Sequence, residues 1–340
     1  MRFFYRSILI WTILIAPISA FAIPFSKAVV FGDSLTDTHN LFAFTGGAVP
    51  NPVYYDNGRF QNGPSYIETL GNNLGLNIQA RMLGGTNYAI GGARTRYHAS
   101  DVDPVTGPPA LGNTPSPLSL LGELYWYLSD LSTSGTTPTS DTLFVVWAGA
   151  NDVADIAMID AMGGAADQYL AQSIGDMSFI INTLINNGAK NLLIPNIPDL
   201  AVTPDMQKLG IDAEATAATL AFNEAMDNVL AGYAGLPNVE ITRFDTFAFV
   251  EDVAADPDAF GFTNLTTPCL TNFFVSGPTS SDPVGVCTNP DEHVFWDDFH
   301  PSAAFHKILG NRMTNALPEP ASIALMVFGL AGISFSRRKG

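Results

Sequence analysis

The sequence predicts an α/β protein, a three-layer α/β/α sandwich around a central parallel sheet of about five strands. The first observation is that short, apolar, β-branched runs alternate along the chain with longer segments whose apolar residues recur at helical spacing. This alternation is typical of βαβ units, in which helices cover both faces of a parallel sheet. The second is that neither an internal repeat nor a long polar linker interrupts it, so one domain over 23–316 is expected.

Five segments are expected as strands because they are short, apolar and rich in β-branched residues. In chain order they are 27–31, 80–89, 142–147, 190–195 and 238–244. Three segments with apolar residues at helical spacing, 168–187, 212–233 and 303–316, are expected as helices. In parallel sheets, functional groups gather at the carboxyl ends of the strands. Ser34 and Asn151 each follow an expected strand, so both are expected at that edge.

The charge balance excludes some partners. The 340 residues include 32 acidic and 15 basic side chains, a net charge of −17, and 47% of them are apolar. Such a surface repels phosphate backbones, so no nucleic-acid partner is expected. Few Lys and Arg also argue against electrostatic binding to anionic lipid heads. The composition suits a soluble, exported protein, and a monomer is expected.

The N-terminus has the features of a secretory signal peptide over residues 1–22. Arg2 and Arg6 precede a short apolar run that closes on Ala20-Phe21-Ala22. A positive start, a short apolar stretch and an A-x-A site define such a signal, and cleavage after Ala22 is expected. The alternative is an uncleaved membrane anchor. Pro17 and the short length of the apolar run argue against it.

The C-terminal tail, 317–340, combines a Pro-Glu-Pro triplet, an apolar stretch over 321–335 and the basic cluster Arg337, Arg338 and Lys339. The stretch is short for a membrane span, which needs about 20 residues, and the basic cluster favours the cytoplasmic side. The tail resembles the PEP-CTERM sorting signal of Gram-negative bacteria. The resemblance implies export through the inner membrane to the periplasm, cell surface or medium, and processing by an exosortase-type enzyme. A plain C-terminal anchor is the alternative.

Cys269 and Cys287 are the only cysteines, and in an exported chain an even count suggests a disulfide. The bridge would contribute ~3 kcal/mol of stability by restricting the unfolded chain. Two free buried thiols are the alternative. No metal site is expected, because neither a C-x-x-C motif nor a histidine pair at ligand spacing occurs.

Ser34 lies in Gly32-Asp33-Ser34-Leu35, directly after the first expected strand. It is a candidate nucleophile, and a serine nucleophile needs a base and a group that orients the base. Asp297 and His300 are three residues apart in FWDDFHPS, so on a helical turn they would share a face. Asp298 is the competing orienter, but at two residues' distance it would face away.

Ester chemistry through a serine also needs hydrogen-bond donors for the oxyanion that develops. The stretch GGTNYAIGGART contains Gly91 and Gly92, where the backbone can approach a ligand closely. The stretch WAGANDV contains Asn151, whose amide is a second donor, and the N–H of Ser34 is a third.

Four blocks together resemble the SGNH, or GDSL, hydrolase family. They are GDSL at 32–35, NYAIGGA at 87–93, GAND at 149–152 and DDFH at 297–300, in the family's order. The resemblance implies the flavodoxin-like SGNH hydrolase fold, with Ser34 as nucleophile, His300 as base and Asp297 as orienter. It also implies an oxyanion site formed by Ser34, Gly92 and Asn151, and no cofactor.

The segment FGDSLTDTHNLF, residues 31–42, resembles the corresponding segment in the branch that contains plant GDSL lipases and secreted bacterial lipases. His39 departs from that segment, in which a small residue is usual. An incidental role is expected for it, as for the other histidines outside the blocks; the alternative is that it narrows or polarises the acyl entrance.

The function expected from these features is a secreted serine esterase or lipase that acts on an acyl lipid or an acylated carbohydrate. Two alternatives stay open: a carbohydrate acetylesterase, suggested by the sorting tail, and a surface-displayed binding protein with a silent triad. Transfer of the acyl group to an alcohol instead of water is also open.

Several residues also have plain structural interpretations. Ser34 and the Asn151-Asp152 pair could each cap a helix, Gly91-Gly92 could form a turn with positive φ, and Asp37 and Asn40 could cap the helix after the nucleophile. The histidines at 98, 293 and 306 are expected to be incidental, and Trp147 and Trp296 to lie in the core.

Overall fold

The structure is a computed structural model that describes residues 25–95 and 118–318. The predicted signal peptide, the sorting tail beyond Pro318 and His98 lie outside the described residues. Among the described helices, none is both long and apolar enough to cross a membrane.

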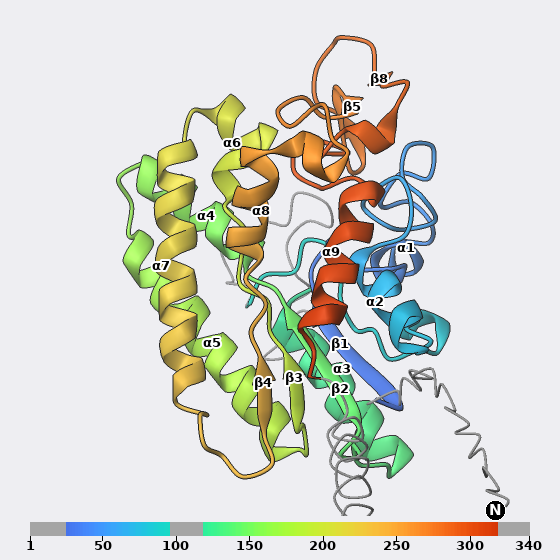
Figure 1. Ribbon diagram of the computed structural model, residues 1–340, viewed down its shortest axis with the longest axis vertical. Coiled ribbons are helices and arrows are strands. Elements are labelled where there is room, and N and C mark those ends of the chain that lie inside the picture. The colour runs from blue at the N-terminus through green and yellow to red at the C-terminus, as the bar shows by residue number, and fades with distance from the viewer. Residues whose placement is uncertain (1–24, 96–117, 319–340) are drawn as a thin grey trace, which may run out of the picture. The chain divides into compact units, whose positions relative to one another are not determined.

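Figure 1 shows how the helices and strands are arranged. The strands are β1 (Lys27–Gly32), β2 (Thr142–Trp147), β3 (Asn191–Leu193), β4 (Glu240–Thr242), β5 (Leu270–Thr271), β6 (Phe273–Phe274), β7 (Gly277–Pro278) and β8 (Gly285–Val286). The α-helices are α1 (Asn40–Phe44), α2 (Tyr66–Leu74), α3 (Leu120–Ser134), α4 (Ala150–Ala161), α5 (Ala166–Asn186), α6 (Pro204–Leu209), α7 (Asp212–Ala231), α8 (Thr246–Ala255) and α9 (Ala303–Ala316). Short 3-10 helices span Arg81–Leu83, Leu200–Val202, Pro257–Phe260 and Pro290–Glu292.

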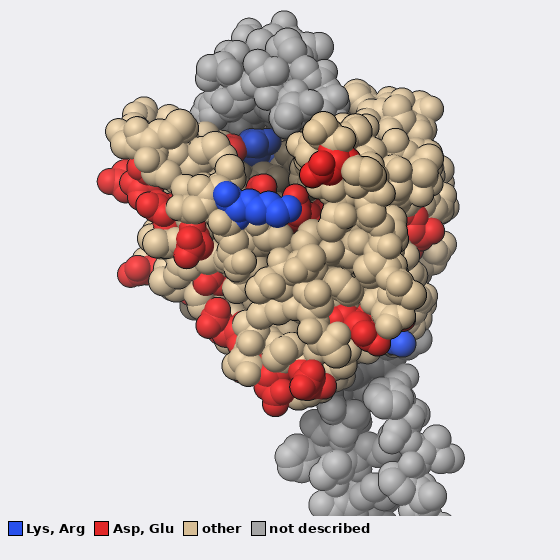
Figure 2. Space-filling view, turned by 90° about the horizontal axis from the view of Figure 1, so that it is seen from above, with Lys and Arg blue, Asp and Glu red and all other residues tan. Residues whose placement is uncertain are grey.

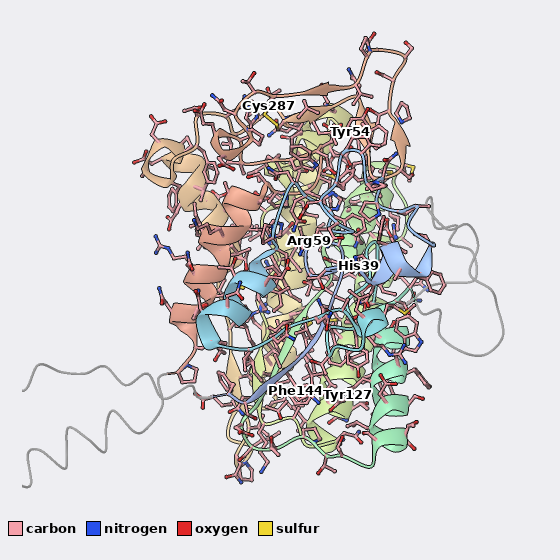
Figure 3. All side chains as sticks on the ribbon, turned by 90° about the vertical axis from the view of Figure 1, so that its right-hand side faces the viewer. His39, Tyr54, Arg59, Tyr127, Phe144 and Cys287 are labelled. Carbon is pink, nitrogen blue, oxygen red and sulfur yellow. A yellow bond between two sulfur atoms is a disulfide. The ribbon has the colours of Figure 1, made fainter. Side chains whose placement is uncertain are left out.

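The central sheet contains the strands β1-β2-β3-β4 in that order, all parallel. All six residues of β2 are buried, as a strand covered on both faces requires. Helices α2 and α9 contact each other on one side of β1, and α3 lies on its other side (Figures 1 and 3). The predicted three-layer α/β/α fold is therefore confirmed, with four regular strands.

Four of the five predicted strands are present, but the prediction of a strand over 80–89 is wrong. Residues 86–90 run parallel to β1, with Val30 N donating to Thr86 O and Tyr88 N donating to Val30 O, yet they form only an isolated bridge. Residues 81–83 form a 3-10 helix instead. Further along, Ile90 N donates to Gly32 O (3.1 Å), but the buried carboxyl of Glu123 in α3 accepts hydrogen bonds from both Gly32 N (3.0 Å) and Ile90 N (3.2 Å). The Gly32 N–H that would continue the ladder is thus already engaged.

The predicted helices correspond to α5, α7 and α9, and the bounds of α9 match the prediction. The sequence analysis did not anticipate α2, α3 or α8. The buried face of α3 contributes Leu120, Leu121, Leu124 and Tyr127 to the core. Tyr127 packs edge-on against Phe144 of β2, with ring centroids 5.9 Å apart, and Figure 3 labels both at the end of the molecule away from Cys287.

A small loop region follows α8 and contains two antiparallel strand pairs, β5 with β8 and β6 with β7. Cys269 and Cys287 form a disulfide just outside the β5–β8 pair. One of the smaller buried clusters of the described residues includes the disulfide and consists of Tyr55, Cys269, Leu270, Phe273 and Trp296, with Cys287 packed against it. The disulfide therefore closes a segment whose inner side is packed against residues far away in the chain.

Replacing both cysteines by serine (Cys269→Ser with Cys287→Ser) is expected to lower the free energy of unfolding by ~3 kcal/mol, because the unfolded chain loses its closed loop. Urea unfolding of the two proteins without reductant measures the difference. Adding reductant should destabilise only the wild type. Equal stability of the two proteins would refute the expectation.

Glu123 gives a pH-dependent prediction. Burial, as the largest cause, raises its pKa well above the ordinary value of 4.5. The folded state therefore holds this proton more tightly than the unfolded chain, and the resulting stabilisation, complete at low pH, is lost as the pH rises through the raised pKa. Glu123→Gln should consequently show a smaller loss of stability between about pH 5 and about pH 8 than the wild type.

Urea unfolding at both pH values tests this. Glu224→Gln, at an exposed position of α7, is the matched control and should retain the wild-type pH dependence. If the free energy of unfolding of Glu123→Gln changes with pH as much as that of the wild type, the result would count against a raised pKa of Glu123.

Candidate active site

Ser34 lies immediately beyond the carboxyl end of β1. A Cβ on Gly32 would come within 2.5 Å of the Trp147 carbonyl oxygen, so only glycine lets the ends of β1 and β2 approach this closely. The backbone then turns, with Thr36 N and Asp37 N both donating to Asp33 O. The next helix, α1, begins only at Asn40 with His39 as its N-cap, so Ser34 does not cap a helix.

Ser34, His300 and Asp297 meet although 266 positions separate the serine from the histidine. His300 Nε2 is 2.9 Å from Ser34 Oγ, and His300 Nδ1 is 2.8 Å from Asp297 Oδ2. Ser34 and His300 are each 3% exposed and Asp297 is fully buried. This arrangement has the geometry of a nucleophile, a base and a group that orients the base.

The local structure between Asp297 and His300 differs from the helical turn that we expected. Residues 297–300 form a bend, and Asp297 Oδ1 accepts hydrogen bonds from the backbone N–H groups of Phe299 (2.9 Å) and His300 (2.6 Å). Because the carboxylate binds the backbone ahead of it, it is also held beside the imidazole. Asp298 points elsewhere, with its Oδ1 2.6 Å from Lys208 Nζ.

Three phenylalanine rings surround the imidazole of His300. Phe274 lies nearly parallel to it at 5.6 Å between ring centroids, Phe299 stands edge-on at 5.7 Å and Phe60 is tilted at 5.3 Å. Phe60 belongs to the segment 45–64, whose neighbouring Arg59 pairs with Glu68 of α2 at 2.6 Å. Segments distant in the chain thus converge on the imidazole of His300.

The candidate oxyanion donors line the same pocket as Ser34. Gly92 has φ of +77° and open space where a Cβ would point, while a Cβ on Gly91 would collide with the Phe60 ring at 2.0 Å. Asn151 lies in the first turn of α4, and its side-chain amide donates one hydrogen bond to Ala93 O (3.0 Å). Within residues 25–95 and 118–318, the N–H groups of Ser34 and Gly92 have no acceptor. Both can therefore donate to a ligand.

Buried carboxyl groups hold the loops that present these donors. Asp37 accepts hydrogen bonds from Gly91 N and from three N–H groups at the start of α1, so it caps that helix as the sequence suggested. Asp152 does not cap α4, because its carboxylate binds Thr95 and Ser173 instead.

Burial is the largest influence on the ionisation of these groups. It raises the pKa of Asp37 and of Asp152 to about 6, against the opposing effect of their donors. It raises the pKa of Asp33, next to Ser34, to about 7.

The pocket has a volume of about 180 Å³ and opens on the end of the molecule to which the strands' carboxyl ends point. Figure 2 looks onto this end and shows acidic and basic side chains meeting around a hollow. Arg94 lines the pocket and forms an ion pair with Asp155, and Asp205 lines it as well. In the described part of the chain, no group of three or more His, Cys, Asp or Glu side chains is placed to hold a metal ion.

His39 does not line the pocket, which agrees with the incidental role expected for it and not with a role at the acyl entrance. Its Nδ1 lies 3.0 Å from Asn57 O, and its ring packs on Phe42. His293 likewise contacts a backbone oxygen, that of Thr267. His306 is buried and accepts a hydrogen bond from Tyr66 N, and burial lowers its pKa to about 3. Trp147 and Trp296 are buried, as expected.

Two residues that matter to the site were missed from the sequence. Glu123 is a single acid within an apolar helical run, a pattern that could have suggested a buried carboxyl. Tyr55, whose hydroxyl lies 2.7 Å from Asp297 Oδ2, stands in a polar loop segment and gives no such signal.

Comparison with known proteins gives two family matches. A family model described as GDSL-like lipase/acylhydrolase matches residues 29–313, and one described as PEP-CTERM protein-sorting motif matches residues 316–339. The second match indicates export and surface sorting in a Gram-negative bacterium and implies an exosortase-type partner.

Similar proteins are found among both curated sequences and solved structures. The chain is 26% identical to a phosphatidylcholine-sterol acyltransferase of Aeromonas hydrophila, over 88% of this chain and 89% of that protein. It is also 26% identical to a GDSL esterase/lipase of Arabidopsis thaliana, over 85% of each. An acetylxylan esterase structure from Geobacillus stearothermophilus matches with a TM-score of 0.42 and 13% identity, over 86% of this chain and 95% of that one.

The lipase match spans most of the chain and includes the four sequence blocks at the pocket. The predicted family and the predicted class of enzyme are therefore confirmed. The chain belongs to the GDSL lipase/acylhydrolase family, whose members hydrolyse ester bonds, and it carries a PEP-CTERM sorting motif.

Proposed function

We propose that this protein is a secreted serine esterase in which Ser34 is the nucleophile, His300 the general base and Asp297 the group that orients the base. The observation that carries the proposal is the hydrogen-bonded series from Ser34 Oγ through His300 to Asp297, with distances of 2.9 and 2.8 Å. The proposal also assigns residues 23–316 to the hydrolase domain, between a cleaved signal peptide and a processed tail.

The reaction begins when Ser34 Oγ attacks the ester carbonyl carbon and His300 Nε2 takes its proton. Negative charge then develops on the carbonyl oxygen, and the N–H groups of Ser34 and Gly92 and the amide of Asn151 stabilise it. The imidazolium returns the proton to the departing alcohol. Water activated by His300 then attacks the acyl-serine and releases the acid. Asp297 stabilises the imidazolium in both halves of the reaction.

Ser34→Ala is expected to abolish hydrolysis of p-nitrophenyl butyrate, because the acyl intermediate forms on Ser34 Oγ. A loss of ~1000-fold or more in kcat is expected, measured by release of p-nitrophenol. Ser129→Ala, at an exposed position of α3, is the control and should keep full activity. A folded Ser34→Ala protein with substantial activity would overturn the assignment.

The walls of the site support an acyl group of several carbons. Phe299 lines both the active-site pocket and a second cavity of about 40 Å³, whose walls are almost entirely apolar. Leu35 and Ala150, the neighbours of Ser34 and Asn151, line that cavity too. A water-sized group needs roughly 10–15 Å³ of such space, so the cavity has room for about three methylene groups.

A graded series of p-nitrophenyl esters tests this assignment. Each buried methylene contributes ~0.8 kcal/mol, so kcat/KM should rise about fourfold per methylene and about 15-fold from acetate to butyrate. Val250→Phe, which fills the cavity from α8, should reduce the preference for hexanoate over acetate. Thermal unfolding checks that the variant is folded.

Other outcomes would favour the alternatives. A preference for acetate, together with acetate release from acetylated polysaccharide, would support a carbohydrate acetylesterase. Failure of a fluorophosphonate probe to label Ser34 in the folded protein would support a binding protein with a silent triad.

A further inference from the structure

Tyr55 lies outside the four sequence blocks, in the segment 45–64, yet its hydroxyl touches the site. The side chain is 2% exposed, and its Oη lies 2.7 Å from Asp297 Oδ2. The contact joins residues 242 positions apart, so it depends on tertiary folding alone. Asp297 Oδ2 receives only one other hydrogen bond within the described residues, from His300 Nδ1.

The direction of the Tyr55 hydrogen bond follows from its second partner. The backbone N–H of Val275 lies 2.8 Å from Tyr55 Oη and can only donate. The hydroxyl oxygen therefore accepts from Val275, and its proton is directed to the carboxylate, which can only accept. Burial and the charge of Asp297 raise the pKa of the Tyr55 phenol, so the hydroxyl stays protonated and remains a donor.

Val275 belongs to a constrained turn at the wall of the pocket. It is the first residue of the two-residue loop between β6 and β7 and has φ of +50°, a conformation that β-branched residues rarely adopt. Two hydrogen bonds hold it there, because its N–H donates to Tyr55 and its carbonyl oxygen accepts from Asn51 N at 2.8 Å. Val275 and its neighbour Phe274 both line the pocket.

The same turn lies within the segment that the Cys269–Cys287 disulfide closes. Its Phe274 ring lies parallel to the imidazole of His300. A single hydroxyl thus links the orienting carboxylate to the loop that covers the base. Loss of that hydroxyl would remove one hydrogen bond from the carboxylate and one from the turn.

We propose that Tyr55 is a positioning residue: its hydroxyl holds the Asp297 carboxylate in line with His300 and fixes the Val275 turn as a wall of the pocket. This inference rests on the proposed function, because it assigns Tyr55 to the same site.

Removal of the hydroxyl should act on catalysis in two ways. The carboxylate loses a donor on Oδ2, so that oxygen is aligned less firmly with the imidazole, which lowers kcat. While the Asp297 carboxylate remains in place, the Tyr55 hydroxyl no longer offsets part of its negative charge. The carboxylate then stabilises the protonated imidazole of His300 more strongly. The acid limb of the pH profile of kcat/KM should therefore move toward higher pH.

The neighbouring Tyr54 offers a matched control. Both tyrosine rings pack on Phe273, at 4.5 Å for Tyr54 and 6.5 Å for Tyr55. The Tyr54 hydroxyl makes no hydrogen bond to residues 25–95 or 118–318, and Figure 3 shows Tyr54 at the same end of the molecule as Cys287. Both phenylalanine variants therefore remove a tyrosine hydroxyl, but only Tyr55→Phe also removes a hydrogen bond to Asp297.

The experiment compares Tyr55→Phe, Tyr54→Phe and Ser34→Ala in the mature chain with p-nitrophenyl butyrate over a range of pH. Tyr55→Phe should lose about 10- to 100-fold in kcat, the scale of a hydrogen bond to a charged group, with KM within about twofold and the acid limb at higher pH. Tyr54→Phe should match the wild type within about twofold.

A second measurement keeps the inference testable if Tyr55→Phe folds poorly. Incorporation of 3-fluorotyrosine at position 55 retains the hydroxyl and makes it a stronger donor, so the acid limb should move toward lower pH. An unchanged limb in that protein would overturn the inference.

Equal kcat and equal pH profiles in Tyr55→Phe and Tyr54→Phe would also overturn it. If Ser34→Ala is inactive in the same experiment, the proposed function survives and only the role of Tyr55 fails. If Ser34→Ala is active, the proposed function itself fails.

Discussion

The buried carboxylate of Asp297 is the constraint on which the site depends. A charge taken fully out of water is costly unless hydrogen-bond donors surround it. Asp297 meets this need with the N–H groups of Phe299 and His300, the imidazole and the Tyr55 hydroxyl. These donors come from two distant parts of the chain. Satisfying one buried charge therefore also fixes the relative positions of the base and the loop that covers it.

The same arrangement recurs at the carboxyl edge of the sheet, where buried acids organise backbone. Glu123 binds Gly32 and Ile90, Asp37 binds Gly91 and the start of α1, and Asp152 binds Thr95. Each carboxyl group binds backbone N–H groups of a loop at this edge. The loops beside Ser34 are thereby held in shapes that leave the N–H groups of Ser34 and Gly92 free for a ligand. Some of the acidic residues in the sequence thus bind backbone inside the molecule and do not face the solvent.

The disulfide and the sorting motif fit one environment. Disulfides persist outside the reducing cytoplasm, and the PEP-CTERM motif indicates export. The segment that the disulfide closes contributes Phe274 and Val275 to the pocket. Restriction of this segment limits the motion of the pocket wall as well as the freedom of the unfolded chain. Stability of the loop region and the shape of the pocket are therefore coupled.

Local pattern in the sequence was sufficient for the alternation of strands and helices, because periodicity and β-branching act within a few residues. It was also sufficient to propose Ser34, Asp297, His300, Gly92 and Asn151 as candidates, since each stands in a short motif. Four of them line one pocket, and Asp297 Oδ2 lies 2.8 Å from His300 Nδ1. The interruption of the expected strand near Ile90, the bend between Asp297 and His300, the orientation of His39 and the contact of Tyr55 all follow from tertiary structure. Each depends on a hydrogen bond or a packing contact that folding alone creates, and a competition between partners distant in the chain leaves no periodic trace in the sequence.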